Sequence, residues 1–304
     1  MKEIRRVEKI SKEEFLQNNI TGNFPIIITD AMSDWDLSRF QPASLKKEFG
    51  SEFTQIYDDL FDLQNVASLE SYLDANFNKP NIDCKNYVRW YTKLKDVDFL
   101  WSDDVFDSLK ESWTHPYFLP QDSLLVPLVR EGENKSITEF RFPYKGLFIS
   151  GKGSRTRLHK DPFNSNAVLC QLYGKKDITL YAPDQEEYVM NGDEFVNIID
   201  PDLNKFSEFT SAKIHTKVTL SAGEIILFPA GWFHDVTCAT DSISITWNFV
   251  HASGLEKLIN HLRKNPNDSQ IEILRFFLGD QVSSTTTVDE IIAVLEKSIV
   301  KERV

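Results

Sequence analysis

The sequence predicts a mainly β protein with flanking helices, with a barrel or sandwich in the second half of the chain. From residue 146 onward, short apolar runs alternate with turns rich in Gly, Pro, Ser and Asp. Many short strands separated by such turns are typical of an all-β barrel or sandwich. The run at 243–250 alternates cleanly, which puts Ser244, Thr246 and Asn248 on one face and Ile243, Ile245, Trp247 and Phe249 on the other.

The segments on either side of this region contain helices and short strands. Ser11 and Glu14 form a capping box, and Ile10 and Phe15 have the spacing of a hydrophobic staple, so we expect a helix to begin there. Residues 94–142 are mixed, aromatic and acidic, and the sequence predicts no order for them. The other expected elements are strands at 24–32 and 87–92 and helices at 42–50, 68–76, 254–264, 269–279 and 287–300.

These patterns divide the chain into three parts of one structural unit. We expect an N-terminal helical and β segment at 1–142 that packs on the barrel, a barrel core at 143–253 and a C-terminal helical segment at 254–304. The C-terminal helices either cover one end of the barrel or pair two subunits into a homodimer.

Composition limits the kinds of partner. The chain of 304 residues is 41% hydrophobic, which is enough for a substantial core. Its net charge of −12 repels phosphate backbones, and no run of Lys or Arg forms a basic arm, so nucleic acid is not an expected partner. A basic peptide is compatible with this charge, although an acidic surface also simply keeps a protein soluble.

The cysteines and the N-terminus favour a reduced, cytoplasmic protein. Cys84, Cys170 and Cys238 are odd in number and far apart, so we expect buried free thiols rather than disulfides or a zinc site. The first fifteen residues contain no apolar segment typical of a signal peptide, and no apolar run is long enough to span a membrane.

A possible metal site lies in the predicted barrel. His159 and Asp161 are two residues apart in a predicted strand, so both side chains leave the same face of the sheet. His234 begins a later strand, directly after the PAGW turn, and is the best candidate for a third ligand. Two imidazole nitrogens and one carboxylate are typical of the facial triad that holds Fe(II) in non-haem oxygenases. We therefore predict that these three residues are the metal ligands and the catalytic residues.

The spacing of His159 and Asp161 alone carries little weight. With six His and 46 acidic residues, one such pair is expected by chance, and the bland alternative is a surface His beside an acid. The weight comes from the strand context and from the second His after its turn. For the remaining histidines we expect ordinary structural roles: His115, His215, His251 and His261.

Three segments resemble the JmjC/cupin-8 family, in the branch that includes the asparaginyl hydroxylase of hypoxia-inducible factor. They are ISKEEFLQNN…FPIIITDAMSDW, TRLHKDPFNSNAVLCQLYGKKDITLYAP and AGEIILFPAGWFHDVTCATDSISITWNFV. The resemblance implies a double-stranded β-helix of the cupin, jelly-roll type with helices around it. It also implies that His159, Asp161 and His234 bind iron. In the family, helices like those at the C-terminus often pair two subunits, so we favour a homodimer slightly over helices that only cover the barrel end.

The resemblance further implies a site for 2-oxoglutarate. This dianion binds iron through its keto-acid end, and its far carboxylate needs a cation. The family takes a Lys two residues after the hairpin Gly, which is Lys176 after Gly174. A shift of one residue in register would bring in Lys175 instead.

Three more residues match family positions in the pocket. Tyr87 matches a tyrosine that hydrogen-bonds the co-substrate, and Thr156 matches a threonine three residues before the first His. Thr156 has the opposite strand parity from His159, so it reaches the pocket only if the strand bends or bulges. Asn248 matches a polar residue near the iron, which its place on the polar face of its strand supports independently.

One feature departs from the family pattern. Relatives often carry an Asn at a fixed distance before the hairpin Gly, and neither Asn164 nor Asn166 falls into that register. The interval from Asp161 to Gly174 is also longer than in the asparaginyl hydroxylase. The resemblance therefore does not predict the substrate-facing wall of the pocket.

Together these features predict an Fe(II)- and 2-oxoglutarate-dependent dioxygenase. It would use O2 to hydroxylate a protein or peptide side chain and release succinate and CO2. Two alternatives remain: a hydroxylase of a free amino acid or another small metabolite, and a non-redox metal-binding cupin that acts as a sensor or scaffold. A hydrolase or isomerase with another metal on the same fold is a third.

Overall fold

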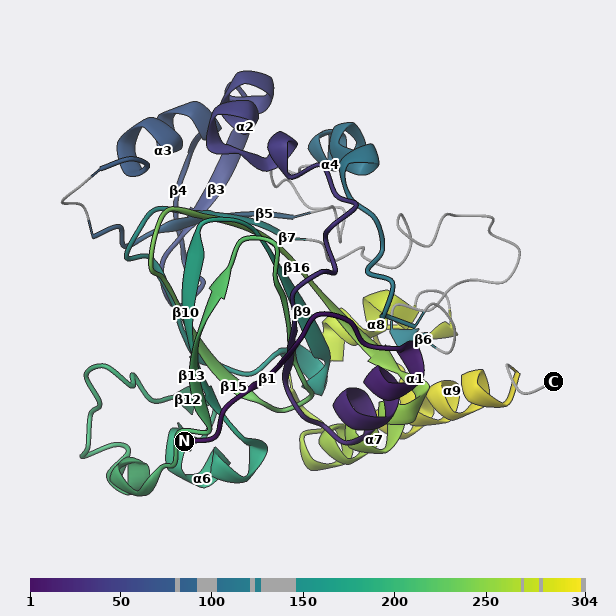
Figure 1. The fold of residues 1–304 in the computed structure, drawn as a ribbon. Coiled ribbons are helices and arrows are strands. Elements are labelled where there is room, and N and C mark those ends of the chain that lie inside the picture. The colour runs from purple at the N-terminus through teal and green to yellow at the C-terminus, as the bar shows by residue number, and fades with distance from the viewer. Residues whose placement is uncertain are drawn as a thin grey trace.

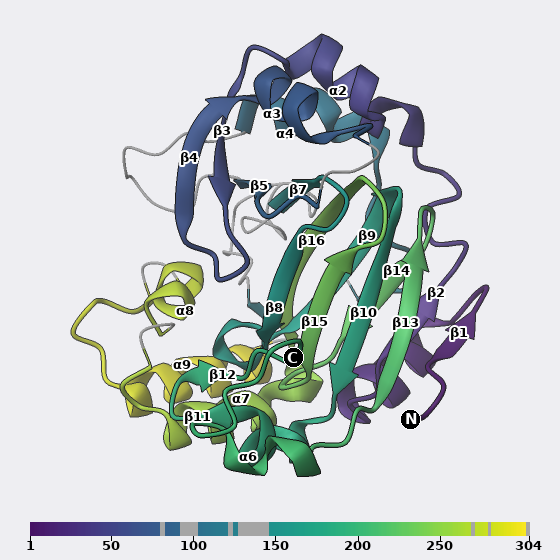
Figure 2. The same ribbon diagram turned by 90° about the vertical axis from the view of Figure 1, so that its left-hand side faces the viewer.

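Two facing sheets form the walls of a barrel in the computed structural model (Figures 1 and 2). The structure describes residues 1–79, 83–91, 103–120, 124–126, 146–268, 271–278 and 281–301. Eight strands build the barrel, in the order β7 (Gly146–Ser150), β8 (Arg155–His159), β9 (Asn166–Tyr173), β10 (Lys175–Tyr181), β13 (Thr216–Ser221), β14 (Ile225–Phe228), β15 (Phe233–Cys238) and β16 (Ser242–His251).

Successive strands alternate between the two sheets, except that β10 and β13 are neighbours in the smaller one, so that the barrel is a double-stranded β-helix. The smaller sheet has the order β13-β10-β15-β8, and the larger contains β14-β9-β16-β7. Both the mainly β fold class and the position of the barrel strands are confirmed. The polar face of β16 points into the barrel, where Thr246 and Asn248 line a cavity, whereas Ile245 and Trp247 pack in the core outside it.

The N-terminal part of the chain extends the larger sheet at both edges. Beyond β7 it continues through β5 (Tyr87–Tyr91), β3 (Phe53–Tyr57) and β4 (Leu63–Ser68), and beyond β14 through β2 (Ile26–Ile28) and β1 (Arg5–Val7). The predicted strands at 24–32 and 87–92 are therefore present in shorter form. The β3–β4 hairpin was not predicted, because the mostly exposed residues of β4 have no alternating apolar pattern. A further short strand, β6 (Leu124–Val126), pairs with β16.

The N-terminal helices cover the outer face of the larger sheet. The Ser11 hydroxyl accepts a hydrogen bond from the Glu14 amide at 3.1 Å and begins α1 (Lys12–Glu14), which continues as a π-helix at Phe15–Thr21. The predicted helices at 42–50 and 68–76 are α2 (Pro42–Phe49) and α3 (Leu69–Asn76). Of the region for which the sequence predicted no order, the structure describes α4 (Asp103–Leu109), a 3-10 turn at Lys110–Ser112 and the strand β6.

The three predicted C-terminal helices are α7 (Leu255–Lys264), α8 (Ile271–Leu278) and α9 (Val288–Lys301). They gather at one end of the barrel, beside α1 (Figure 1). Leu262, Leu274 and Leu295 form one apolar cluster with Phe163 and Val250 of the barrel region. The helices therefore bury apolar surface against their own chain. The predicted division at 142 lies outside the described residues, and the three-part division stays a prediction.

The interior of the barrel is apolar only in part. Residues from both sheets, among them Leu169, Ile178, Leu180 and Ile226, form a buried cluster with Trp232. The largest cluster lies instead between the outer face of the larger sheet and the N-terminal helices. Because this external core stabilises the sheet, part of the barrel interior can remain hollow and polar.

A long connection between β10 and β13 forms a separate layer at the mouth of the barrel. It contains α6 (Glu186–Val189), the short strands β11 (Met190–Asn191) and β12 (Glu194–Phe195), and a 3-10 helix at Ser207–Ser211. Its own apolar cluster includes Val189 and Val196 and rests on Phe233 of β15. The connection is thus attached to one of the strands that carry the predicted metal ligands.

The cysteines and the helices agree with two further expectations from the sequence. Cys84, Cys170 and Cys238 are buried free thiols, as predicted. Among the described residues, no helix has both the length and the apolar character needed to cross a bilayer.

The central strand β16 is expected to be essential for stability. Ile245 is 0% exposed and packs in the largest core cluster, so Ile245→Ala should lower the free energy of unfolding by about 2–5 kcal/mol. Ile199→Ala removes the same atoms from a side chain that is 69% exposed, and it should change the free energy of unfolding by less than about 0.5 kcal/mol. Urea denaturation of both variants measures the difference, and equal losses would contradict the position of this core.

Candidate metal centre

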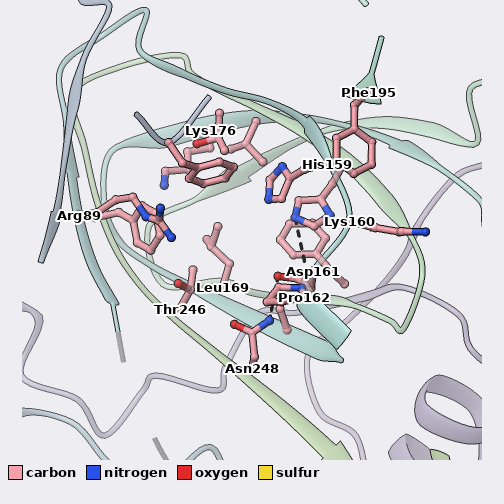
Figure 3. A pocket seen from close by; sticks show the side chains of 17 residues that line it. Arg89, His159, Lys160, Asp161, Pro162, Leu169, Lys176, Phe195, Thr246 and Asn248 are labelled. Atoms are coloured by element: carbon pink, nitrogen blue, oxygen red, sulfur yellow. Dashed lines mark hydrogen bonds and ion pairs between the residues drawn. The ribbon is translucent and has the colours of Figure 1, made fainter. Parts of the chain in front are cut away.

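The two predicted histidine ligands lie opposite each other on neighbouring strands. His159 of β8 is the register partner of His234 of β15, and their ring centroids are 4.2 Å apart. Asp161 lies two residues after His159, the last residue of β8, and both line the same pocket (Figure 3). One ligand atom from each of the three residues lies within 4.8 Å of the other two. The structure thus brings together the three side chains that the sequence singled out.

Backbone carbonyls fix the orientation of both imidazoles. Nδ1 of His159 lies 2.8 Å from the carbonyl oxygen of Arg157, and Nδ1 of His234 lies 3.2 Å from that of Trp232. A carbonyl oxygen can only accept, so both Nδ1 atoms carry the proton and both Nε2 atoms present a lone pair. Such bonds to the second ring nitrogen are typical of histidines that bind metals.

Aromatic rings hold the imidazoles in place. The ring of Phe228 stacks on His234 with centroids 4.1 Å apart and an interplanar angle of 1°, and Phe61 meets His159 edge-on at 5.1 Å. Phe228 ends β14 and Phe61 lies in the β3–β4 hairpin. The metal centre therefore depends on parts of the chain far apart in sequence.

The turn before His234 is locked by the N-terminal segment. The Trp232 indole donates to the carbonyl oxygen of Asn23 at 2.9 Å, and the Asn23 amide donates to that of Ala230 at 3.0 Å. Gly231 has a φ of +76°, and a Cβ there would lie 2.8 Å from the Asn164 side-chain oxygen. Only glycine fits this turn without strain, which explains the P-A-G-W sequence.

Asn248 orients the carboxylate ligand. Its side-chain nitrogen donates to Oδ1 of Asp161 at 2.8 Å and to the hydroxyl of Ser165 at 3.0 Å. The second carboxylate oxygen, Oδ2, lies 3.8 Å from Nε2 of His234. Asn248 thus contacts a metal ligand, and its position agrees with the polar face predicted for its strand.

Burial controls the protonation of the three ligands. It lowers the pKa of His159 to about 3, with a further lowering by His234, and it lowers the pKa of His234 to about 4. Burial also raises the pKa of Asp161, against the opposite effects of His159 and the Asn248 hydrogen bond. Both imidazoles are therefore neutral at pH 7, which is the form that binds a metal.

A buried ion pair ties together the two strands that carry the histidines. Nε of Arg155 on β8 donates to Oδ1 of Asp235 on β15 at 2.8 Å. Nη1 of Arg155 also donates to Asn197 at 2.9 Å, which attaches the long β10–β13 connection to the same place. The pair lies on the face opposite His234, so it fixes the strand spacing without entering the cavity.

The three ligands open into a cavity of about 330 Å³. Lys176 lies inside it with only 4% of its surface exposed, and its Nζ donates to the Ser244 hydroxyl at 2.7 Å. Burial lowers the pKa of this ammonium group. Lys175 is exposed, so the register places Lys176 rather than its neighbour in the pocket.

Thr156 reaches the cavity because β8 bulges. His234 pairs with His159, but Val236 pairs with Thr156, so β8 has one extra residue in this interval. The bulge reverses the parity that would otherwise point Thr156 away, and Thr156 lines the cavity. The sequence predicted that Thr156 would reach the pocket only through a bend or bulge of its strand, and the structure contains that bulge.

Tyr87 lies next to this region but does not line the cavity. Its hydroxyl is buried and makes no hydrogen bond within the described part of the chain. Burial raises the pKa of Tyr87, while Arg89 and then Thr156 act to lower it, so both lie near its hydroxyl.

The sequence missed several residues of the pocket. Four residues from other parts of the chain line the cavity: Phe61, Arg89, Phe195 and Thr246. Lys160, which lies between the predicted ligands His159 and Asp161, also lines it. Strand parity could have identified two of them, since Arg89 follows Tyr87 by two residues and Thr246 precedes Asn248 by two. Phe61 and Phe195 come from loops that carry no such signal.

The other histidines have structural surroundings. The His115 ring lies 3.2 Å from the Leu119 carbonyl oxygen, and the His261 ring lies 3.3 Å from the Asp268 carboxylate. His215 packs against Trp232, and His251 bonds to Ser253. These contacts agree with the ordinary roles expected from the sequence.

The donor set fits a ferrous ion. Two neutral nitrogens and one carboxylate oxygen on one side of a small cavity leave room for further ligands on the other side. This combination of a double-stranded β-helix and a facial triad defines a class of metal-binding cupins. The chain belongs to the family described as "Cupin-like domain", which matches residues 11–254.

Several characterised proteins are similar to this chain. The 2-oxoglutarate and iron-dependent oxygenase JMJD4 of Gallus gallus is 31% identical over 82% of the chain and 60% of its own length. The tRNA wybutosine-synthesizing protein 5 of Mus musculus is 33% identical over 82% of the chain and 78% of its own length. The arginine-specific demethylase JMJ20 of Arabidopsis thaliana is 26% identical over 91% of the chain and 64% of its own length. The chain thus spans less than two thirds of the JMJD4 and JMJ20 relatives.

The metal-free protein is expected to lose stability as the pH falls from 6.5 toward 4. An unfolded His takes up a proton near pH 6.5, whereas the folded pKa values of His159 and His234 are about 3 and about 4. The unfolded state therefore binds more protons in this window, and stability rises with pH. Urea denaturation in the presence of a chelator, at about pH 7 and about pH 5, measures the loss. A His159→Gln/His234→Gln double variant should lose less, and an equal loss would contradict the buried neutral pair.

Proposed function

We propose that this chain is an Fe(II)- and 2-oxoglutarate-dependent oxygenase that hydroxylates a protein or peptide side chain and releases succinate and CO2. The observation that carries the proposal is that three metal-donor atoms and one buried lysine face the same cavity. Bound Fe(II), with 2-oxoglutarate and O2, supplies the oxidising chemistry. The names of the JMJD4 relatives, which specify iron and 2-oxoglutarate, support the same cofactors.

The residues have distinct tasks in this proposal. His159, Asp161 and His234 hold the metal, and Asn248 keeps the carboxylate ligand in position through its 2.8 Å hydrogen bond. Lys176 binds the far carboxylate of 2-oxoglutarate. Burying its charge without a partner costs free energy, and pairing with a dianionic ligand would offset this cost.

Thr156 and Tyr87 complete the co-substrate site. The Thr156 hydroxyl lies on the cavity wall, and the buried Tyr87 hydroxyl lies near Thr156, outside the lining, so that it would act on the co-substrate from that side. The aromatic rings around the histidines exclude water from the metal. A dry cavity limits reaction of the oxidant with anything but the substrate.

Two alternatives differ in what the cavity accepts. A small-molecule hydroxylase would use the same chemistry on a free amino acid or another metabolite, and the small cavity is compatible with it. A sensor or scaffold cupin would bind metal without turnover. The buried Lys176 favours the enzyme, because a scaffold does not need a cation beside the metal.

The partners remain proposals. We favour a protein substrate over nucleic acid because of the net charge of −12, although one relative is named for tRNA. Absence of nucleic-acid binding, a cytoplasmic location and a homodimer through the C-terminal helices all stay predictions. Light scattering of the full chain tests the homodimer, since a monomer has a mass of 35.1 kDa.

Substitutions should separate the metal site from the co-substrate site. Asp161→Ala is expected to abolish 2-oxoglutarate turnover with little loss of stability, because the residue lies outside the apolar clusters. Lys176→Met should raise the dissociation constant of 2-oxoglutarate by roughly 10- to 150-fold, the value of a hydrogen bond to a charged group. Lys175→Met, on the exposed neighbour, is the matched control.

Succinate release and calorimetric titration with 2-oxoglutarate measure the two effects. Wild-type turnover in both the Asp161 and the Lys176 variant would refute the assignment. A screen of peptides and metabolites by mass spectrometry, in search of a gain of one oxygen, distinguishes a protein substrate from a small molecule.

A further inference from the structure

The turn that follows the carboxylate ligand has a strained backbone. Asp161 is followed by a single 3-10 turn at Pro162–Asn164, in which Phe163 has a φ of 43° and a ψ of 30° and Asn164 has a φ of 55°. Asn is tolerated in this left-handed region, but a bulky residue such as Phe is rarely found there. Such a conformation persists only where the surrounding structure enforces it, so the turn needs an anchor.

The C-terminal helices provide an anchor for this turn. Phe163 is 1% exposed and belongs to the same apolar cluster as Leu258 of α7, and α7 packs directly against the turn. The residue that ends the turn, Ser165, is also buried, and its hydroxyl accepts a hydrogen bond from Asn248 at 3.0 Å. The same Asn248 nitrogen donates to Asp161 at 2.8 Å. Burial of the Phe163 ring thus fixes a turn that has a metal ligand at one end and a partner of that ligand's support at the other.

The same helix also supports the turn before the second histidine. Nζ of Lys257 on α7 donates to the last two carbonyl oxygens of the π-helix Phe15–Thr21, at 2.8 and 3.0 Å. A lysine is a favourable cap for carbonyls at the end of a helix. Two residues after this helix, Asn23 exchanges hydrogen bonds with the P-A-G-W turn that leads to His234. One lysine and one short segment therefore connect α7 to the second ligand-bearing turn.

The two turns meet beside a second cavity. The side-chain oxygen of Asn164 would lie only 2.8 Å from a Cβ on Gly231, so the two turns touch. Both residues line a cavity of about 390 Å³ together with Lys257, whereas Pro162 lines the metal cavity. The turn after Asp161 is thus a wall between two cavities. Because it faces open space on both sides, it depends on the burial of Phe163 for its position.

We propose that α7 sets the geometry of the metal centre, with Phe163 as a positioning residue for Asp161 and Lys257 as a positioning residue for His234. The inference rests on the metal site of the proposed function and deepens it. The match to the family domain ends at residue 254, and α7 begins at Leu255. A helix beyond the matched domain is therefore required for metal binding.

Metal titrations of paired variants test the proposal. Phe163→Ala is compared with Leu295→Ala, which removes an equally buried side chain from α9 in the same cluster. Lys257→Met is compared with Lys264→Met, on the same helix, whose side chain is 77% exposed. Phe163→Leu keeps an apolar side chain in the cluster and is the rescue variant. Calorimetry with Mn(II) measures affinity, and the visible absorption of the Co(II)-loaded proteins reports the arrangement of the ligands.

Phe163→Ala is expected to raise the dissociation constant of Mn(II) by roughly 10- to 100-fold, the usual effect of losing a contact that orients a metal ligand. Lys257→Met should raise it too, whereas Phe163→Leu, Leu295→Ala and Lys264→Met should stay close to the wild type. The Co(II) absorption bands should change in Phe163→Ala and Lys257→Met alone. Thermal unfolding should show similar losses of stability in Phe163→Ala and Leu295→Ala, which separates metal binding from stability.

Two results would overturn the proposal. A Phe163→Ala variant with the Mn(II) affinity and Co(II) spectrum of Leu295→Ala removes the role of Phe163, and a Lys257→Met variant that binds metal like Lys264→Met removes that of Lys257. If Phe163→Ala does not fold, the comparison of the two lysine variants alone decides whether α7 acts on the metal centre. A wild type that binds neither Mn(II) nor Co(II) would instead refute the proposed function on which the inference rests.

Discussion

The pairing of His159 with His234 across two neighbouring strands is the constraint on which the rest of this structure depends. Side chains directly opposite each other in an antiparallel pair are close enough to share one ion, and a shift of one residue would turn one of them to the other face. The backbone carbonyls of Arg157 and Trp232 then leave both Nε2 atoms facing the same point. The strand register thus brings the donor atoms of the two histidines together.

Much of the remaining architecture maintains this register while the barrel interior stays partly open. The largest apolar cluster lies outside the barrel, so the sheet is stable without a completely filled interior. The Arg155–Asp235 ion pair fixes β8 against β15 from the outer face, and Asn23 holds the turn before His234. Buried polar groups are costly when they lack partners, and beside the metal site Asn248 is hydrogen-bonded to both Asp161 and Ser165.

The sequence was most informative where the periodicity was strong. The alternation on β16 separated its polar face from its apolar face, and the capping box at Ser11 predicted a helix start. Spacing and strand context identified the three candidate metal ligands. The bulge that turns Thr156 inward could not be predicted, because it depends on how β8 pairs with β15. Phe61 could not be assigned, because the β3–β4 hairpin in which it lies has no apolar pattern.

The central claim is that one ferrous ion and 2-oxoglutarate bind together at this triad. Anaerobic addition of Fe(II) and 2-oxoglutarate to the metal-free protein, followed by absorption spectroscopy, tests it most directly. The account predicts a visible charge-transfer band that saturates at one iron per chain and disappears in air as succinate forms. A protein that binds Fe(II) without any such band, or that forms no succinate in oxygen, would contradict it.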